Sequence, residues 1–263
     1  MASRLGYGAR GLVYLGVGGI ALLAALDLTP RASGASGAIE AWASWPLGLL
    51  LIAGVAAGLA AFAAWRFVEA AFDADNHGVS PKGIAIRVGQ AISGVVYAAL
   101  AWSTLELLDG FEDIGEADES DSARTLAAEA LALPYGDWIL IAVGVALLGV
   151  GVGNLVQGAF QDFAKRLDCS DALCRIAVPF ARLGYIGRGV ATLPAGVFLL
   201  RAGLDVRSAE ARSWGDALQT LEGQPFGSVI LGAVALGLVA FGLFGLFEAV
   251  FRRIKAPATL AVA

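Results

Sequence analysis

An arginine-rich sequence frame occurs three times along the chain, and its guanidinium groups are the chemistry that recurs most clearly. A guanidinium can bind a carboxylate or a phosphate through two parallel N–H groups. The frame therefore predicts ion pairs or contacts with anionic groups. Its three copies, aligned without gaps, are Arg4-x-Gly6-Tyr7-x-x-Arg10-Gly11-x-x-Tyr14, Arg87-x-Gly89-Gln90-x-x-Ser93-Gly94-x-x-Tyr97 and Arg182-x-Gly184-Tyr185-x-x-Arg188-Gly189-x-x-Thr192.

A carboxylate recurs with the second arginine of the frame. The copy that lacks this arginine also lacks the carboxylate, which indicates that the two side chains are in contact. An unpaired charge within a membrane helix is costly, and pairing reduces that cost. The sequence therefore predicts two fold-stabilising ion pairs within repeats and one neutral counterpart, namely Arg10 with Glu69, Arg188 with Glu248, and Ser93 with Gln157. A functional switch at these pairs is the alternative.

The first arginine of the frame is present in all three copies and has no acid that recurs with it. A guanidinium just before a membrane span can meet a lipid phosphate, and the positive start of the helix adds attraction. A tyrosine suits the membrane interface, where its ring and its hydroxyl are both satisfied. Ordinary anchoring without a specific site is the alternative. The residues predicted to contact anionic headgroups are Arg4, Arg87, Arg182, Tyr7 and Tyr185.

Long uncharged segments must position these residues. Of the 263 residues, 58% are hydrophobic and 16% are charged, whereas roughly 25% of the residues of a soluble domain are charged. A membrane-spanning helix needs about 20 apolar residues, and arginines beside the shorter segments can extend their stems toward water. We predict an all-α membrane protein with six transmembrane helices, built on segments 11–26, 41–65, 88–105, 138–161, 189–200 and 223–247.

The even-numbered spans have recurring residues of their own. A Pro-x-Gly sequence begins each one, as proline is favoured in the first turn of a helix, and an acid or amide and then a phenylalanine follow at a fixed distance. The three sets are Pro46, Gly48, Glu69 and Phe72; Pro134, Gly136, Gln157 and Phe160; and Pro225, Gly227, Glu248 and Phe251. We therefore predict three tandem two-helix repeats, at residues 1–80, 81–175 and 176–263, which together form one membrane domain.

Short amphipathic segments precede the even-numbered spans. Segment 122–133 has apolar residues at helical spacing before Pro134, and comparable segments precede Pro46 and Pro225. We expect three short surface helices on the external side of the membrane.

This arrangement resembles the bacterial Domain of Unknown Function 1206 family, whose members are membrane proteins built from repeated two-helix units headed by an Arg-x-Gly-Tyr-like frame. The resemblance covers nearly the whole chain. The second copy departs from the frame, with Gln90 in place of tyrosine and Ser93 in place of arginine. The resemblance implies a fold and a membrane location, and it implies no activity.

The distribution of basic residues predicts the orientation. If the amino terminus is cytoplasmic, 13 of the 18 lysines and arginines lie on that side. Because lysine and arginine in short loops set the topology, we predict a multi-pass protein of the bacterial plasma membrane with both termini in the cytoplasm. The external segment 109–121 is strongly acidic. It could concentrate cations, but a solvated loop is the favoured interpretation.

The sequence lacks the motifs of common enzymes and metal sites. It has no Gly-x-Ser-x-Gly elbow, no zinc-protease histidine pair and no phosphate loop. Segment 73–78 begins like a calcium loop, but Ile84 stands where the loop requires a carboxylate. Cys169 and Cys174 are predicted to be reduced thiols. We therefore predict no catalytic activity, no bound metal and no cofactor, and the net charge of −5 argues against nucleic-acid binding.

Small residues predict where helices approach closely. Gly54 and Gly58 lie four residues apart in one span, as do Gly149 and Gly153 in another, and such pairs commonly line helix contacts. Pro194 predicts a kink within the fifth span.

Three classes of function remain, of which an enzyme is the least favoured. We predict a structural or accessory bundle whose basic cytoplasmic edge contacts anionic lipid headgroups, a protein partner or a second copy of the chain. A channel or transporter for a small or anionic solute is the alternative. Charged residues are nearly absent from the centres of the predicted spans, and such residues are the usual mark of an ion pathway.

Overall fold

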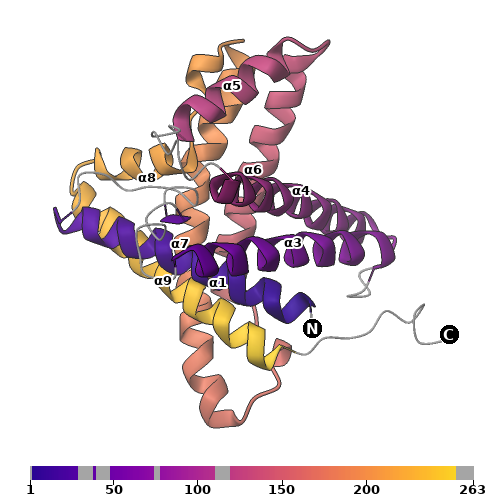
Figure 1. Cartoon of the computed structure of the whole chain (residues 1–263), viewed down its shortest axis with the longest axis vertical. Coiled ribbons are helices and arrows are strands. Elements are labelled where there is room, and N and C mark those ends of the chain that lie inside the picture. The colour runs from indigo at the N-terminus through magenta and orange to yellow at the C-terminus, as the bar shows by residue number, and fades with distance from the viewer. Residues whose placement is uncertain (1, 29–37, 40–47, 74–77, 110–118, 253–263) are drawn as a thin grey trace.

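The chain folds into helices joined by short connections, as shown in Figure 1. The computed structural model describes residues 2–28, 38–39, 48–73, 78–109 and 119–252. The long helices are α1 (Ala2–Ala25), α3 (Gly48–Phe72), α4 (Pro81–Asp109), α6 (Gly136–Phe160), α7 (Asp171–Leu204) and α9 (Gly227–Phe251). The short ones are α5 (Glu119–Leu131), η1 (Ala164–Arg166), η2 (Ser208–Glu210) and α8 (Trp214–Glu222).

The six long helices confirm the predicted all-α membrane fold. Each contains a stretch of at least 20 residues that is long and apolar enough to cross a bilayer. Within the described residues, β pairing is limited to one isolated bridge, between Leu167 and Arg252. The protein is a six-span membrane protein.

Two of the three predicted surface helices are present, and the third falls on residues outside the described part of the chain. α5 ends just before Pro134, and α8 ends just before Pro225. α5 also packs against α8 and η2. These short helices therefore cover one part of the bundle together.

Pro134 and Pro225 lie before their spans and not in the first turn, which corrects the prediction for these two, while Pro46 lies outside the described residues. α6 and α9 begin at the glycine, and the residue between has a left-handed backbone, with φ of 63° at Tyr135 and 60° at Phe226. A Cβ atom on Gly136 would collide with the last turn of α5, and one on Gly227 with the last turn of α8. Glycine is required because the new span passes against the backbone of the preceding surface helix.

The main helix pairs are offset from the sequence repeats by one helix. α4 packs on α3 and α7 packs on α6, while α1 closes the cycle by packing on α9. The helices of the middle repeat, α4 and α6, have little contact with each other. Each first helix of a repeat therefore packs on the second helix of the repeat before it, and we call these three pairs the offset pairs.

The three offset pairs share one register. A Cβ atom added to the glycine after the frame's second arginine would lie 2.9–3.2 Å from a side chain two residues before the acid position of the partner helix. These contacts join Gly11 to Leu246, Gly94 to Phe67 and Gly189 to Leu155. The three offset pairs are thus equivalent in register, although the two helices within a repeat pack together in the first and third repeats and have little contact in the middle one.

Two sets of helices cross in the molecule. In Figure 1, α6 and α7 run along the long axis, whereas α1, α3, α4 and α9 run across it. The sets meet where α7 packs on α9, and a Cβ atom on Gly187 would lie 2.7 Å from the Cα atom of Gly237. Because the backbones touch there, the middle of α7 reaches both α9 and α1.

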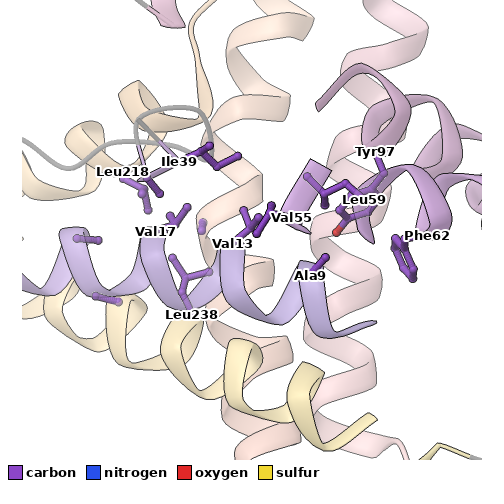
Figure 2. Packing of buried hydrophobic residues seen from close by; sticks show 14 of the residues in the cluster. Ala9, Val13, Val17, Ile39, Val55, Leu59, Phe62, Tyr97, Leu218 and Leu238 are labelled. Carbon is purple, nitrogen blue, oxygen red and sulfur yellow. The ribbon is translucent and has the colours of Figure 1, made fainter. Parts of the chain in front are cut away.

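The principal core lies between α1, α3 and α9. Figure 2 shows Val13 and Val17 of α1 facing Val55 of α3 and Leu238 of α9. All four side chains are buried. This packing holds α1 in place, and α1 carries the first copy of the arginine frame.

The packing glycines differ from those predicted. Gly54, Gly149 and Gly153 have no neighbouring atom within 4 Å of an added Cβ. The α6 and α7 helices instead meet through glycines spaced by seven residues, a period that keeps one face toward the partner. These are Gly144, Gly151 and Gly158 on α6, and Gly189, Gly196 and Gly203 on α7. α7 remains one helix through Pro179 and Pro194.

Candidate functional site

Arg10 forms a buried ion pair with Glu248. Its Nη2 donates to Oε2 of Glu248 at 2.6 Å, and the two side chains are 2% and 1% exposed. Three aromatic rings surround the guanidinium, with centroids 5.0 Å away at Tyr7, 5.3 Å at Phe62 and 4.8 Å at Phe241. The rings add cation–π attraction and keep water from the pair.

The two glutamates each bind a nearby arginine on their own helix. Glu248 also accepts from Nη1 of Arg252 through its other oxygen. Glu69 accepts from Nη1 of Arg66 at 2.8 Å and from Nε1 of Trp65 at 2.6 Å. Both buried carboxylates are therefore compensated.

The predicted pairing within repeats is wrong. Arg10 of the first repeat binds Glu248 of the third and not Glu69, and Glu248 does not pair with Arg188. The physical reason is the offset packing, which lays α1 along α9. The second arginine of a frame therefore faces the acid position of the preceding repeat, counted around the cycle.

The neutral counterpart pair is also separated. Ser93 lies on α4 and Gln157 on α6, and these helices have little contact. In the shared register, Gln157 stands relative to Arg188 as Glu248 stands relative to Arg10. The neutral Gln157 therefore occupies the position opposite the cation Arg188.

Arg188 has aromatic neighbours and no carboxylate partner among the described residues. Its guanidinium lies over the rings of Tyr14, at 5.4 Å, and Phe241, at 4.9 Å. The side chain is half-buried, whereas that of Arg10 is buried. Phe241 thus lies beneath both arginines, one from each set of crossing helices.

The three copies of the frame converge on this region. Tyr14 and Tyr97 interact with each other, and both lie within electrostatic range of Arg10 and Arg188. Tyr185 packs at 5.2 Å from Phe241. We call this group the central cluster, and its members are Arg10, Arg188, Tyr7, Tyr14, Tyr97, Tyr185, Phe241 and Glu248.

Donors exceed acceptors in and around the central cluster. The hydroxyl of Tyr7 and Nε of Arg10 are buried without a hydrogen-bond partner among the described residues. The described residues of this region include four cations, Arg10, Arg66, Arg188 and Arg252, and two carboxylates, Glu69 and Glu248. Chemically, the arrangement is suited to binding an anion.

The five residues predicted to contact headgroups have different surroundings. Tyr7 and Tyr185 are buried, at 0% and 7% exposure, which corrects their assignment to the interface. They turn inward because the glycine-rich helices approach closely enough for their rings to fill the core. Arg4 and Arg182 are exposed, and lipid contact by them remains a prediction.

Arg87 caps the end of a helix. Its Nε donates to the carbonyl oxygen of Ala70 at 2.7 Å, and its Nη2 donates to that of Ala71 at 3.0 Å. A cation suits this position, because the last carbonyl groups of a helix lack partners within it. An apolar groove of about 560 Å³ adjoins the side chain, lined by Phe67, Ala70, Ala71, Ile84, Arg87, Val88 and Ala91.

Sequence reasoning missed the aromatic residues that enclose the arginines. Phe62 lies seven residues before Glu69, and Phe241 lies seven before Glu248, whereas Val150 precedes Gln157 at that spacing. Seven residues are two helical turns, so the ring and the acid share a face. This recurrence is the signal that could have identified Phe62 and Phe241.

The connection between α6 and α7 contains a disulfide. Cys169 and Cys174 are bonded, which corrects the prediction of reduced thiols. The backbone N–H of Asp168 donates to the carbonyl oxygen of Phe251 at 2.7 Å, so this connection lies beside the end of α9. Lys165 donates to Asp162 and lowers the pKa of that exposed carboxyl.

The other polar segments contribute little to a site. Asp73 accepts from the backbone N–H of Gly78 at 2.7 Å, as in a polar turn after a helix. His77 and most of the acidic segment 109–121 lie outside the described residues. No group of three potential metal ligands occurs among the residues that the structure describes.

Comparison with known proteins places the chain in a family. The sequence pattern of the Domain of Unknown Function (DUF1206) matches residues 5–73, 88–161 and 183–252, so each match falls within one predicted repeat. The chain is similar to "Uncharacterized protein YxxB" of Bacillus subtilis (strain 168), with 29% identity over 255 residues, 95% of this chain and 90% of that protein. No solved structure matches the chain. The chain belongs to the DUF1206 family.

Proposed function

We propose that the protein is a structural or accessory bundle of the bacterial plasma membrane, whose basic cytoplasmic edge contacts anionic lipid headgroups. In this proposal both termini are cytoplasmic, and the protein catalyses no reaction and binds no nucleic acid. The same edge offers a surface to a protein partner or a second copy of the chain. The apolar groove beside Arg87 is the observation that carries the proposal.

The groove has the two parts that a lipid needs. Its walls are apolar side chains of α3 and α4, which suit an acyl chain, and Arg87 supplies a cation at the level where α3 ends. A guanidinium at that level is suited to a phosphate group. Arg4 lies in the first turn of α1 and Arg182 lies inside α7, and their exposed side chains add further positive charge.

One observation supports the proposed orientation in the membrane, and one opposes it. Exposed Lys165 and Arg175 flank the α6–α7 connection, which supports a cytoplasmic location by the positive-inside rule. The disulfide in the same connection favours an oxidising compartment, because cytosolic thiols are kept reduced. We retain the cytoplasmic assignment because the charge bias extends over all three repeats.

Reporter fusions test the orientation. A reporter fused after Ala263 should be active only in its cytoplasmic form, and one inserted within segment 116–121 only in its periplasmic form. Labelling of Cys169 and Cys174 in intact cells, after reduction, with a membrane-impermeant maleimide gives a second readout. A periplasmic signal from the carboxyl terminus together with labelled cysteines would reverse the assignment.

Lipid retention tests the basic edge. Simultaneous replacement of Arg4, Arg87 and Arg182 by glutamine should reduce the anionic lipid that co-purifies with the protein, measured by mass spectrometry. The matched control replaces Arg124, Arg201 and Arg207, which lie on the opposite side of the membrane. Equal lipid retention in the two folded variants would contradict the proposal.

Transport of a small anionic solute is the second candidate function. The excess of guanidinium groups in the central cluster favours it, because a permeating anion requires positive charge within the membrane. Proteoliposomes loaded with phosphate or acetate should show protein-dependent flux if this candidate is correct. Absence of flux together with retained anionic lipid would favour the accessory bundle.

A further inference from the structure

We propose that Arg188 is the principal ligand of an internal oxyanion site at the crossing of α1, α7 and α9. The ligand is a phosphate or carboxylate group bound through the edge of the guanidinium. This site is separate from the lipid groove beside Arg87 and uses different residues, so it does not depend on the proposed lipid contact.

Two aromatic rings adjoin the guanidinium of Arg188. Its central carbon lies over the rings of Tyr14 and Phe241, 5.4 Å and 4.9 Å from their centroids. The N–H donors of a guanidinium lie in its plane and can bind two oxygens at once. No hydrogen bond or ion pair to these donors occurs within the described residues. The side chain is half-buried, so part of it is accessible in the described structure.

The charge balance calls for an anion at this place. Glu248 is shared by Arg10 and Arg252, and Glu69 is bound by Arg66. Arg188 therefore adds a positive charge to an interior that already contains Arg10 in electrostatic range. A guanidinium remains charged inside a protein, and isolating it from water is costly unless an anion compensates it.

The repeats show how the other arginine avoids this cost. Arg10 receives the carboxylate of Glu248 from its offset partner helix, whereas the equivalent position opposite Arg188 is the neutral Gln157. A glutamate there would complete the cluster with protein atoms alone. Glutamine leaves the compensation of Arg188 to a ligand.

The neighbouring hydroxyls favour an oxyanion. Tyr14 and Tyr97 come from α1 and α4, interact with each other, and lie within electrostatic range of Arg188. A phenolic O–H can donate to an oxyanion that the guanidinium holds. A free small anion and the phosphate of a lipid headgroup share this chemistry, so the experiment must separate the two sources.

Binding measurements in neutral nanodiscs test the site. The full chain is reconstituted in phosphatidylcholine and titrated calorimetrically with sodium phosphate or sodium acetate at constant ionic strength, with chloride as the balancing anion. The wild-type protein should bind at least one of the two oxyanions saturably. Arg188→Gln should weaken that binding at least about tenfold. Arg188→Lys, which keeps the charge without the planar fork, should retain part of it.

A control on the same helix separates the site from general charge. Arg201→Gln removes an exposed cation near the end of α7 and should leave the oxyanion affinity within twofold of wild type. Melting temperature without added oxyanion tests folding. Arg188→Gln should melt at or above the wild-type temperature, since an uncompensated interior charge has been removed. A melting temperature several degrees below wild type would identify a structural partner for Arg188 and overturn the proposal.

A second bilayer distinguishes the source of the oxyanion. In phosphatidylglycerol nanodiscs, a headgroup ligand would compete with phosphate and reduce the measured affinity, whereas a site for free anions would be unaffected. Absence of phosphate and acetate binding in neutral discs, combined with equal retention of anionic lipid by Arg188→Gln and Arg201→Gln, would overturn the inference. Retention of edge lipid by Arg188→Gln would show that the groove functions independently.

Discussion

The surroundings of Arg10 and Arg188 differ although the two residues occupy the same position in the first and third repeats. Both are followed by a glycine that packs closely on the offset partner helix, Gly11 in one case and Gly189 in the other. Arg10 is buried and bound to Glu248, whereas Arg188 is half-buried without a carboxylate among the described residues. Equivalent helix packing in the two repeats therefore does not give the two arginines equivalent charge compensation.

The comparison also shows where a symmetric bundle becomes asymmetric. Backbone contact depends on the absence of side chains, so any copy that keeps its glycines keeps its register. Charge compensation depends on one residue of the partner helix, which is glutamate opposite Arg10 and glutamine opposite Arg188. One such substitution converts a closed ion pair into a place for a ligand.

The largest effect is expected from removing the carboxylate that binds Arg10. Glu248→Gln leaves both Arg10 and Arg252 without their carboxylate, and should lower the free energy of unfolding by about 3–5 kcal/mol. Thermal unfolding in a mild detergent measures the loss. A loss below about 1 kcal/mol would mean that the pair is not buried as described.

The next prediction compares the effects of replacing Arg10 and Arg188 on the free energy of unfolding. Arg10→Gln should lower the free energy of unfolding by roughly 2–3 kcal/mol, because Glu248 keeps only Arg252 as a partner. Arg188→Gln should leave that free energy unchanged or raise it in anion-free buffer. Equal destabilisation by the two substitutions would remove the distinction on which the comparison rests.

Substitutions at Gly11 and Gly189 test whether two of the offset pairs, α1 with α9 and α7 with α6, are equally tightly packed. Gly11→Ala and Gly189→Ala each place a Cβ atom 2.8–2.9 Å from a backbone oxygen of the partner helix. Each should cost about 1–3 kcal/mol through overpacking, with similar values for both. Gly149→Ala is the matched control, since it meets nothing within 4 Å and should stabilise its helix by up to about 1 kcal/mol.

The smallest effect is expected from giving Arg188 a carboxylate at the position that corresponds to Glu248. Gln157→Glu offers Arg188 the acid that Arg10 has, and should stabilise the protein by about 1 kcal/mol and abolish oxyanion binding. A double-mutant cycle with Arg188→Gln isolates the interaction. Additive effects in that cycle would show that residues 157 and 188 do not meet.

The fold could be predicted in detail because its signals are local. A run of about 20 apolar residues forms a membrane helix wherever it packs, and a frame repeated three times requires equivalent units. The segments before Pro134 and Pro225 became α5 and α8 for the same reason. The starts of α6 and α9 lie two residues after their prolines, because the contact that excludes a side chain from Gly136 and Gly227 is made with another helix.

The candidate site could be predicted in its residues and not in its partners. The recurrence of arginine with glutamate singled out Arg10 and Glu69 as partners, yet Arg10 binds Glu248 of the third repeat and Glu69 binds Arg66. The joint loss of arginine and carboxylate in the middle repeat indicated pairing within a repeat, whereas the register around the cycle places Gln157 opposite Arg188 and Glu69 opposite Ser93. Tyr7 and Tyr185 were misplaced for a related reason, since the same side chain suits either an interface or a glycine-lined core.

The sequence by itself determined the membrane location, the six helices and the three repeats, because apolar length and motif spacing act within single helices. Only the tertiary structure decided that α1 closes on α9, that α7 crosses both of them, and that Arg188 meets Tyr14 and Phe241 there. These contacts join residues far apart in the chain. They depend on how closely glycine-bearing faces approach in space, which the order of residues along one helix does not specify.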